Sequence, residues 1–208
     1  NSSSGVGVDR RKLKNTMYEV LIGETPAKDA RIHTEFANLD LLPSSMDLAG
    51  AELELIEMEH REAILKNAIV PLRAEYDFIL IDCPPSLGII TTNALSVADT
   101  LLVPIQCEYY AMEGLSQLLN SVRRVKRQYN EQLDIEGVLL TMYDGRLNLT
   151  QQVVEEVKKY FPRKVFATVI PRTVRLSEAP SFGRPIGYFD HSSKGAYAYD
   201  ALADEVLR

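Results

Sequence analysis

Short apolar runs and amphipathic stretches alternate along most of the chain, with polar loops between them. Apolar runs rich in β-branched residues predict strands that are buried on both faces, as in a parallel sheet. We expect strands at 39–43, 78–82, 101–106, 135–142, 165–171 and, as a short edge strand, 185–189. Apolar residues three and four positions apart predict helices between these strands. We expect helices at 13–22, 48–58, 63–76, 115–129, 153–161 and 195–208.

This order of elements predicts an α/β fold with a doubly wound, mostly parallel sheet and helices on both of its faces. The sequence shows no internal repeat, low-complexity segment or linker, so a single domain over 1–208 is expected. A chain of this length is long enough to bury one core. Pro71 lies inside the helix predicted at 63–76 and should kink or shorten it.

The end of the strand predicted at 78–82 carries the first candidate chemistry. Asp82 follows four apolar residues and precedes Pro84 and Pro85. A carboxylate at the carboxyl end of a parallel strand lies in the crevice where α/β folds bind ligands. Beside a phosphate-binding loop, such an aspartate holds Mg²⁺. The alternative is an ordinary strand whose last residue caps a turn.

Composition and charge narrow the function only slightly. The hydrophobic fraction is 46% and the charged fraction 25%, as in an average globular protein. Cys83 and Cys107 lack CxxC spacing, which favours a reducing cytoplasm and argues against a metal site through these thiols. No apolar run approaches the ~18 residues that a membrane span requires.

The net charge of −6 hides an asymmetry. Residues 1–120 carry 9 Lys and Arg against 18 Asp and Glu, a balance of −9, whereas residues 121–208 carry 14 against 11, a balance of +3. Nucleic-acid binding requires a local patch of positive charge and does not require a positive net charge of the whole chain. The second half therefore permits DNA binding, although a solvated helix face would give a similar count.

Three long motifs follow one another in the chain: DCPPSLG at 82–88, PIQCEYYAMEG at 104–114 and PRTVRLSEAPS at 171–181. Together they closely resemble the ParA/Soj partitioning ATPases, which belong with the MinD ATPases to the deviant Walker A class. The resemblance extends over essentially the whole chain and implies a P-loop NTPase-like fold.

One family feature is missing from the sequence. The family begins with a strand and a glycine-rich loop of the form KGGxGKT, whose backbone N–H groups and lysines bind phosphates. The only early glycines, Gly5 and Gly7, have no lysine or hydroxyl at P-loop spacing. The resemblance therefore implies an N-terminally truncated chain without the first two strands. We expect this fragment alone to bind ATP poorly and to be inactive.

The resemblance also implies a nucleotide site for ATP and Mg²⁺. Asp82 matches the Walker B aspartate, a catalytic residue that coordinates Mg²⁺ through water. Glu108 matches a residue that reaches toward the partner's nucleotide in related dimers; the alternative is an exposed loop carboxylate. Met142 and Pro171 match residues on either side of the adenine, and the alternative is that both are core residues at strand ends.

Two arginines, Arg146 and Arg175, match residues that contact DNA nonspecifically in Soj-like proteins. The planar fork of arginine suits phosphate oxygens, and both residues lie in predicted loops. Arg172, Lys194 and Arg184 would widen the patch. The alternative is that these are surface arginines that serve solubility. Glu178 lies in the turn after Arg175 and its charge would oppose phosphates, so we assign it no DNA role.

The resemblance implies an ATP-dependent homodimer that binds DNA nonspecifically and is released when a ParB-type centromere-binding protein stimulates hydrolysis. Hydrolysis would proceed by in-line attack of water on the γ-phosphate. We expect a cytoplasmic, nucleoid-associated protein with no membrane partner. A MinD-like membrane-cycling ATPase is the alternative, and the acidic residues in 197–208 disfavour it. A third alternative is a non-catalytic interaction protein, if the chain is complete as written.

Overall fold

The computed structural model describes residues 1–84, 88–108 and 111–208. Contacts within these residues form two compact units. Unit 1 comprises 1–98 and 125–131, and unit 2 comprises 99–124 and 132–208. The prediction of one ATPase domain over 1–208 stays a prediction.

Unit 2 contains a parallel three-stranded sheet. Its strands are β3 (Thr100–Gln106), β4 (Asp134–Tyr143) and β5 (Val165–Pro171), hydrogen-bonded in the order β3-β4-β5. The strands predicted at 101–106, 135–142 and 165–171 are therefore confirmed. Each is an apolar run, and residues 137–140 of the central strand are buried. Such continuous burial is typical of a parallel strand covered on both faces.

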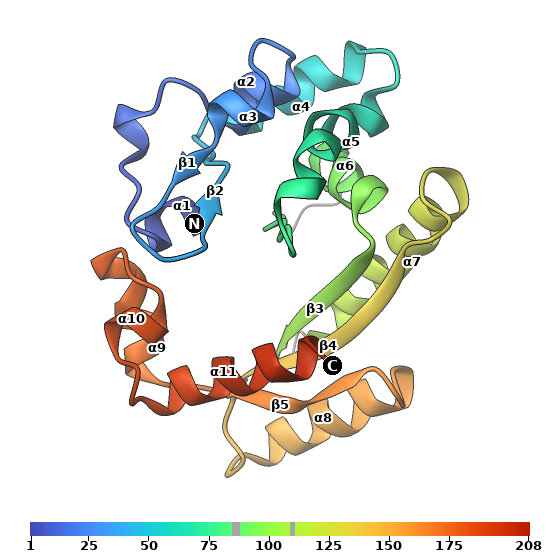
Figure 1. Ribbon diagram of the computed structural model, residues 1–208. Coiled ribbons are helices and arrows are strands. Elements are labelled where there is room, and N and C mark those ends of the chain that lie inside the picture. The colour runs from blue at the N-terminus through green and yellow to red at the C-terminus, as the bar shows by residue number, and fades with distance from the viewer. Residues whose placement is uncertain (85–87, 109–110) are drawn as a thin grey trace. The chain divides into compact units, whose positions relative to one another are not determined.

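Helices cover both faces of this sheet (Figure 1). Val138 and Leu140 of β4 share one apolar cluster with Val157 of α8 (Asn148–Tyr160) and residues of α7 (Ala111–Gln128). Leu139, which points to the opposite face, packs with Leu202 of α11 (Lys194–Val206). The doubly wound α/β arrangement predicted from the sequence is confirmed.

The segment predicted as an edge strand at 185–189 is helical instead, which makes that prediction wrong. It forms α10 (Ile186–Phe189), which follows α9 (Val174–Glu178) and the 3₁₀ turn η4 (Ala179–Phe182). A further strand beside β5 would need free backbone donors there. The N–H groups of Ala167 and Thr168 donate instead to Glu205 of α11, at 2.6 and 2.9 Å.

A close approach between α9 and α11 fixes the position of α9 in unit 2. Gly195 is buried in the first turn of α11, and a Cβ atom built on it would lie 2.6 Å from Cγ of Leu176 in α9. Only glycine fits there without displacing the leucine. The α9 segment, which carries Arg175, is thereby held against the start of α11.

Unit 1 is mostly helical around a core of Leu21, Leu55, Leu65, Ile69 and Ala94. Its elements are α1 (Ser2–Gly5), η1 (Arg10–Lys12), α2 (Met17–Leu21), α3 (Ala27–Ala30), β1 (Ile32–His33), β2 (Asp40–Leu41), α4 (Leu48–Glu57), η2 (Arg61–Ala63), α5 (Ile64–Ile69), η3 (Val70–Glu75) and α6 (Ile89–Val97). None of the helices in the described residues is both long and apolar enough to cross a membrane.

The sequence predicted the helices of unit 1 better than its strands. The helix expected at 48–58 is α4, and the one expected at 63–76 becomes 3₁₀ at Val70, next to Pro71, as predicted for that proline. The helix expected at 13–22 is shorter, because it begins at Met17 behind a capping box of Thr16 and Glu19. The strand expected at 39–43 is only the short β2, antiparallel to β1.

The run 78–82 is not a strand, so the prediction of a strand buried on both faces is wrong. Phe78 is 58% exposed and Leu80 is 92% exposed. A strand is stable only where neighbours pair its N–H and C=O groups. None of the described strands pairs with this run.

A buried asparagine joins the helices of unit 1. The side chain of Asn93 in α6 is fully buried and both of its polar atoms are hydrogen-bonded. Its Oδ1 accepts from the N–H of Leu65 at 3.0 Å, and its Nδ2 donates to the carbonyls of Arg61 at 2.7 Å and Ile89 at 3.0 Å. Asn93 therefore caps the start of α5, whose N-cap Ala63 has no polar side chain.

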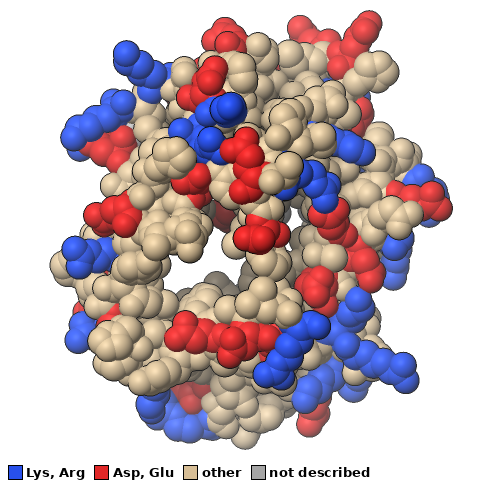
Figure 2. Space-filling view, in the orientation of Figure 1, with Lys and Arg blue, Asp and Glu red and all other residues tan. Residues whose placement is uncertain are grey.

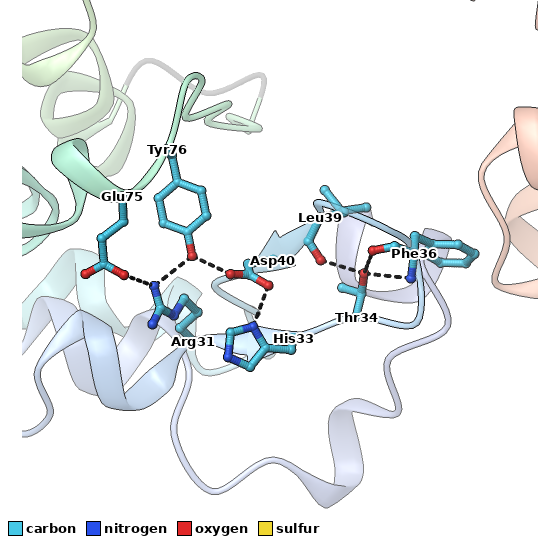
Figure 3. Close-up of polar contacts among 8 residues, drawn as sticks. All are labelled: Arg31, His33, Thr34, Phe36, Leu39, Asp40, Glu75 and Tyr76. Atoms are coloured by element: carbon cyan, nitrogen blue, oxygen red, sulfur yellow. Dashed lines mark hydrogen bonds and ion pairs between the residues drawn. The ribbon is translucent and has the colours of Figure 1, made fainter.

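A polar network ties the β1–β2 pair to the end of η3 (Figure 3). Arg31 donates to Glu75 Oε2 at 2.6 Å and to the Tyr76 hydroxyl at 2.8 Å. The Tyr76 hydroxyl donates to Asp40, and His33 Nδ1 lies 2.7 Å from the other Asp40 oxygen. The bond from Tyr76 and, more weakly, the contact with His33 lower the pKa of Asp40. The network anchors the chain directly before the run that leads to Asp82.

Candidate functional site

The carboxyl ends of the three parallel strands in unit 2 lie at one edge of the sheet, where α/β folds bind ligands. Glu108 follows β3, Met142 lies one residue before the end of β4, and Pro171 ends β5. Tyr143 of β4 is the register partner of Pro171, so Met142 and Pro171 belong to neighbouring strand ends. The structure brings together the two residues that the resemblance assigned to the adenine.

Met142 has an unusual backbone conformation. Its φ of 51° lies in the left-handed region, and the register between β4 and β5 shifts between Leu140 and Tyr143. A non-glycine residue in this region is strained, and such residues occur preferentially at ligand sites. The bulge turns Met142 outward, leaving it 40% exposed at the sheet edge. It is therefore not a buried core residue, the alternative raised by its sequence position.

Glu108 is exposed beside the same edge. Its Oε1 lies 3.9 Å from Nη1 of Arg172, which directly follows β5. A hollow of about 420 Å³ between β3 and α7 includes Glu108 in its lining, but not Met142 or Pro171. The structure thus places Glu108 at the sheet edge beside Arg172, the residue that follows Pro171 in the chain. Its assignment to a partner's nucleotide stays a prediction.

Asp82 belongs to unit 1 and is exposed in the irregular run 77–84. One of its oxygens accepts a hydrogen bond from the hydroxyl of Ser2. Within the described residues, no group of three or more His, Cys, Asp or Glu side chains could hold a metal ion. The assignment of Asp82 to Mg²⁺ stays a prediction.

Arg146 lies in the turn between β4 and α8 and is paired with Asp144. Its Nε donates to Asp144 Oδ1 at 2.9 Å and its Nη2 to Oδ2 at 2.6 Å, a bidentate pair. The backbone N–H of Arg146 also donates to Oδ1, at 3.1 Å. These bonds from Arg146 lower the pKa of Asp144 to about 2. The Arg146 side chain remains 89% exposed.

Arg175 lies in the short helix α9, so the prediction that it lies in a loop is wrong. It is held by side chains of α9 and of the residues at the end of α10. Its Nη1 donates to Glu178 Oε2 at 3.1 Å, and its Nε lies 3.1 Å from Asp190 Oδ2. The guanidinium carbon is 5.7 Å from the centre of the Phe189 ring, which stacks on Phe182. Arg175 is therefore more strongly positioned than an isolated surface arginine.

Lys194 and Arg184, the other cations of the predicted DNA patch, are exposed. Lys194 is the first residue of α11, after the N-cap Ser193. Basic and acidic side chains are interspersed over most of the face in Figure 2. Carboxylates also lie beside Arg146 and Arg175. The residues that sequence reasoning missed are the anionic partners, Asp144 and Asp190. The two-residue spacing of Asp144 and Arg146 could have predicted their ion pair from the sequence. The pairing of Asp190 with Arg175 could be found only from the structure.

The similarities of the chain to known proteins cover nearly all of its length. A family model described as an AAA domain matches residues 1–135. The chain is 50% identical over 208 residues to "Chromosome partitioning protein ParA" of Myxococcus xanthus, covering all of this chain and 74% of that protein. It is 52% identical to "Sporulation initiation inhibitor protein Soj" of Bacillus subtilis, covering 99% of this chain and 81% of that protein.

Solved structures agree with the fold. The cobyrinic acid a,c-diamide synthase of Mycobacterium smegmatis, with bound ADP and magnesium, is 37% identical with a TM-score of 0.83, over 98% of this chain and 75% of that one. The cell-division ATPase MinD of Pyrococcus furiosus is 27% identical with a TM-score of 0.78, over 99% and 79%. These similarities confirm the family that the three motifs indicated: the chain belongs to the ParA/Soj family of partitioning ATPases.

Proposed function

We propose that the protein acts in DNA partitioning as an ATP-dependent homodimer that binds DNA nonspecifically through Arg146 and Arg175. A ParB-type centromere-binding protein would stimulate ATP hydrolysis and release the dimer from DNA. The observation that carries this proposal is the position of the two arginines. Both follow strand ends of unit 2 by a few residues, in the half of the chain with a positive charge balance of 14 against 11.

The residues present fit a nucleotide in part. Met142 offers an exposed side chain and Pro171 a half-buried ring at neighbouring strand ends, and both suit the faces of an adenine. The carboxylate of Asp82 is an oxygen ligand of the kind that Mg²⁺ prefers, and Mg²⁺ is commonly held by one or two carboxylates together with water and phosphate. Bound Mg²⁺ would neutralise charge on the phosphates. In the full-length protein Asp82 would hold this ion through water.

DNA binding through phosphates predicts a specific salt dependence. Replacing Arg146 and Arg175 with alanine in the full-length protein should strongly weaken ATP-dependent DNA binding and leave nucleotide binding intact. Each lost phosphate contact should lower the magnitude of the salt slope by about one unit. The loss should be similar on unrelated DNA sequences, because phosphate contacts do not read sequence.

The measurement is DNA affinity against salt concentration, with ATP and without it. Arg124 and Arg163 provide a matched control, because both are exposed arginines of unit 2 outside the proposed surface. Their double alanine variant removes the same charge and should change the affinity far less. If the two double variants lose affinity equally, only net charge matters and the proposed surface is wrong.

A further inference from the structure

The predicted DNA surface is only weakly positive as it stands. Five cations were assigned to it, Arg146, Arg172, Arg175, Arg184 and Lys194. Four carboxylates pair with three of them: Asp144 with Arg146, Glu108 with Arg172, and Glu178 and Asp190 with Arg175. The carboxylates therefore cancel most of the formal charge of the cations. A surface that attracts DNA phosphates must first shed or outweigh this negative charge.

The contacts at Arg146 engage the atoms that a phosphate would use. A guanidinium binds a phosphate best through two parallel N–H donors. At Arg146 the Nε and Nη2 donors form such a fork, and both oxygens of Asp144 already occupy it. A DNA phosphate can take this fork only by displacing the carboxylate.

Arg175 is occupied in the same way by two separate carboxylates. Glu178 takes Nη1 and Asp190 takes Nε, so two of its three nitrogens already have anionic partners. The Asp190 side chain is 24% exposed and also accepts a hydrogen bond from Ser192 at 3.1 Å, which holds it in place. Phe189 limits the guanidinium further by contact with its face.

We propose that Asp144, Glu178 and Asp190 form an electrostatic latch on the DNA surface, in which they hold Arg146 and Arg175 in ion pairs that DNA phosphates must replace. This inference rests on the proposed function. Ion pairs between exposed groups stabilise a protein only slightly, so a nearby row of phosphates can displace them. A single phosphate that replaces one carboxylate gains little binding free energy. Duplex DNA presents many phosphates close together, so it can replace several carboxylates at once and bind more tightly. The latch would therefore favour polyanions over small anions.

The test removes the latch and leaves the arginines unchanged. Asp144→Asn and Asp190→Asn, combined in the full-length protein, abolish two of the negative charges. The asparagine at 144 keeps an oxygen that can accept the N–H of Arg146, so the turn is retained. In the ATP state at low salt, this variant should bind duplex DNA about two- to fivefold more tightly than the unmodified protein. Its affinity should also fall more steeply with salt, because less negative charge opposes the phosphates.

The chain offers a matched control. Glu156 and Asp134 also form ion pairs in unit 2, but with Lys159 and Lys164. Glu156→Gln combined with Asp134→Asn changes the net charge by the same amount without touching either arginine. A latch variant that binds DNA at least about twice as tightly as this control supports the proposal. Equal affinities of the two variants would overturn it, since net charge alone would then explain the gain.

Weaker binding by the latch variant would also overturn the proposal, because the carboxylates would then orient the arginines for DNA and not restrain them. The Arg146→Ala, Arg175→Ala variant, measured in the same assay, separates this inference from the proposed function. If that variant loses DNA binding while the latch variant matches its control, the latch is wrong and the DNA surface stands. If the arginine variant binds DNA as the unmodified protein does, the DNA surface is wrong and the latch fails with it.

Discussion

The carboxylate of Glu205 closes the free edge of β5, and replacing it should destabilise unit 2. The side chain accepts N–H bonds of 2.6 Å from Ala167 and 2.9 Å from Thr168. Glu205→Ala leaves both donors to water. A hydrogen bond to a charged group stabilises a protein by about 1.5–3 kcal/mol, and solvent weakens this contribution at a partly exposed sheet edge. We therefore expect the two bonds together to contribute about 1–2 kcal/mol.

A second effect opposes this loss. Glu205 lies in the last turn of α11, where the helix dipole disfavours a negative charge by about 0.3–1 kcal/mol. The net cost of Glu205→Ala should therefore be about 1 kcal/mol, which lowers the melting temperature of a chain this size by about 2–4 °C. Asp204 is the matched control, because it is exposed and its side chain has no hydrogen bond or ion pair within the described residues. Asp204→Ala should be neutral or slightly stabilising.

The pH dependence of the effect has a definite sign. Burial alone would raise the pKa of Glu205, but the N–H bonds from Ala167 and Thr168 outweigh it and lower the pKa below its ordinary value. A carboxyl whose pKa is lower in the folded state contributes stability above its unfolded-state pKa and loses it as the pH falls through the folded one. The difference between the unmodified protein and Glu205→Gln should therefore be largest near neutral pH and vanish in acid.

Urea unfolding gives the size of the effect, and amide hydrogen exchange gives its location. In Glu205→Ala the amides of Ala167 and Thr168 should exchange faster, whereas those of the central strand β4 should change only with global stability. Glu205→Gln keeps one acceptor and should lie between the unmodified protein and Glu205→Ala. Unchanged protection of Ala167 and Thr168 in Glu205→Ala would refute the reasoning.

Two further substitutions test the packing that positions these elements. Asn93→Ala should destabilise unit 1 by about 2–4 kcal/mol, because it leaves the buried N–H of Leu65 and carbonyl of Arg61 without their partner; a urea midpoint equal to that of the unmodified protein would contradict it. Gly195→Ala should cost about 1–3 kcal/mol through its clash with Leu176. Thermal unfolding should show Leu176→Ala recovering part of that loss, and strictly additive effects of the two changes would argue against the clash.

The central elements of unit 2 could be predicted because their signals are local. Each strand is an apolar run that stays buried wherever it lies in the sheet, and each long helix carries its own apolar stripe. The apolar runs at 135–142 and 165–171 placed Met142 and Pro171 at strand ends, and the structure puts these ends side by side. The positive φ of Met142 could not be predicted, because methionine does not favour it and only the bulge between β4 and β5 requires it.

The failures arise where a segment depends on a distant partner. Residues 78–82 have the composition of a buried strand, but composition cannot supply the neighbours that a strand must pair with. The segment at 185–189 has a suitable pattern too, yet Glu205 occupies the edge donors that it would have used. The pairing of Arg175 with Asp190 likewise joins two short helices whose approach is set by tertiary packing.

The proposed base contacts lie at the ends of β4 and β5, and the proposed DNA contacts follow them closely along the chain. Met142 precedes Arg146 by four residues, and Pro171 precedes Arg175 by four. Asp144, the proposed latch residue, lies midway between Met142 and Arg146 and directly follows the strained bulge. A base packed against Met142 would restrain this bulge and, through two residues of backbone, the carboxylate that holds Arg146. Coupling between ATP binding and DNA binding therefore requires no long pathway through the fold. Dimerisation would add to this effect, because it would double the number of arginines presented to DNA.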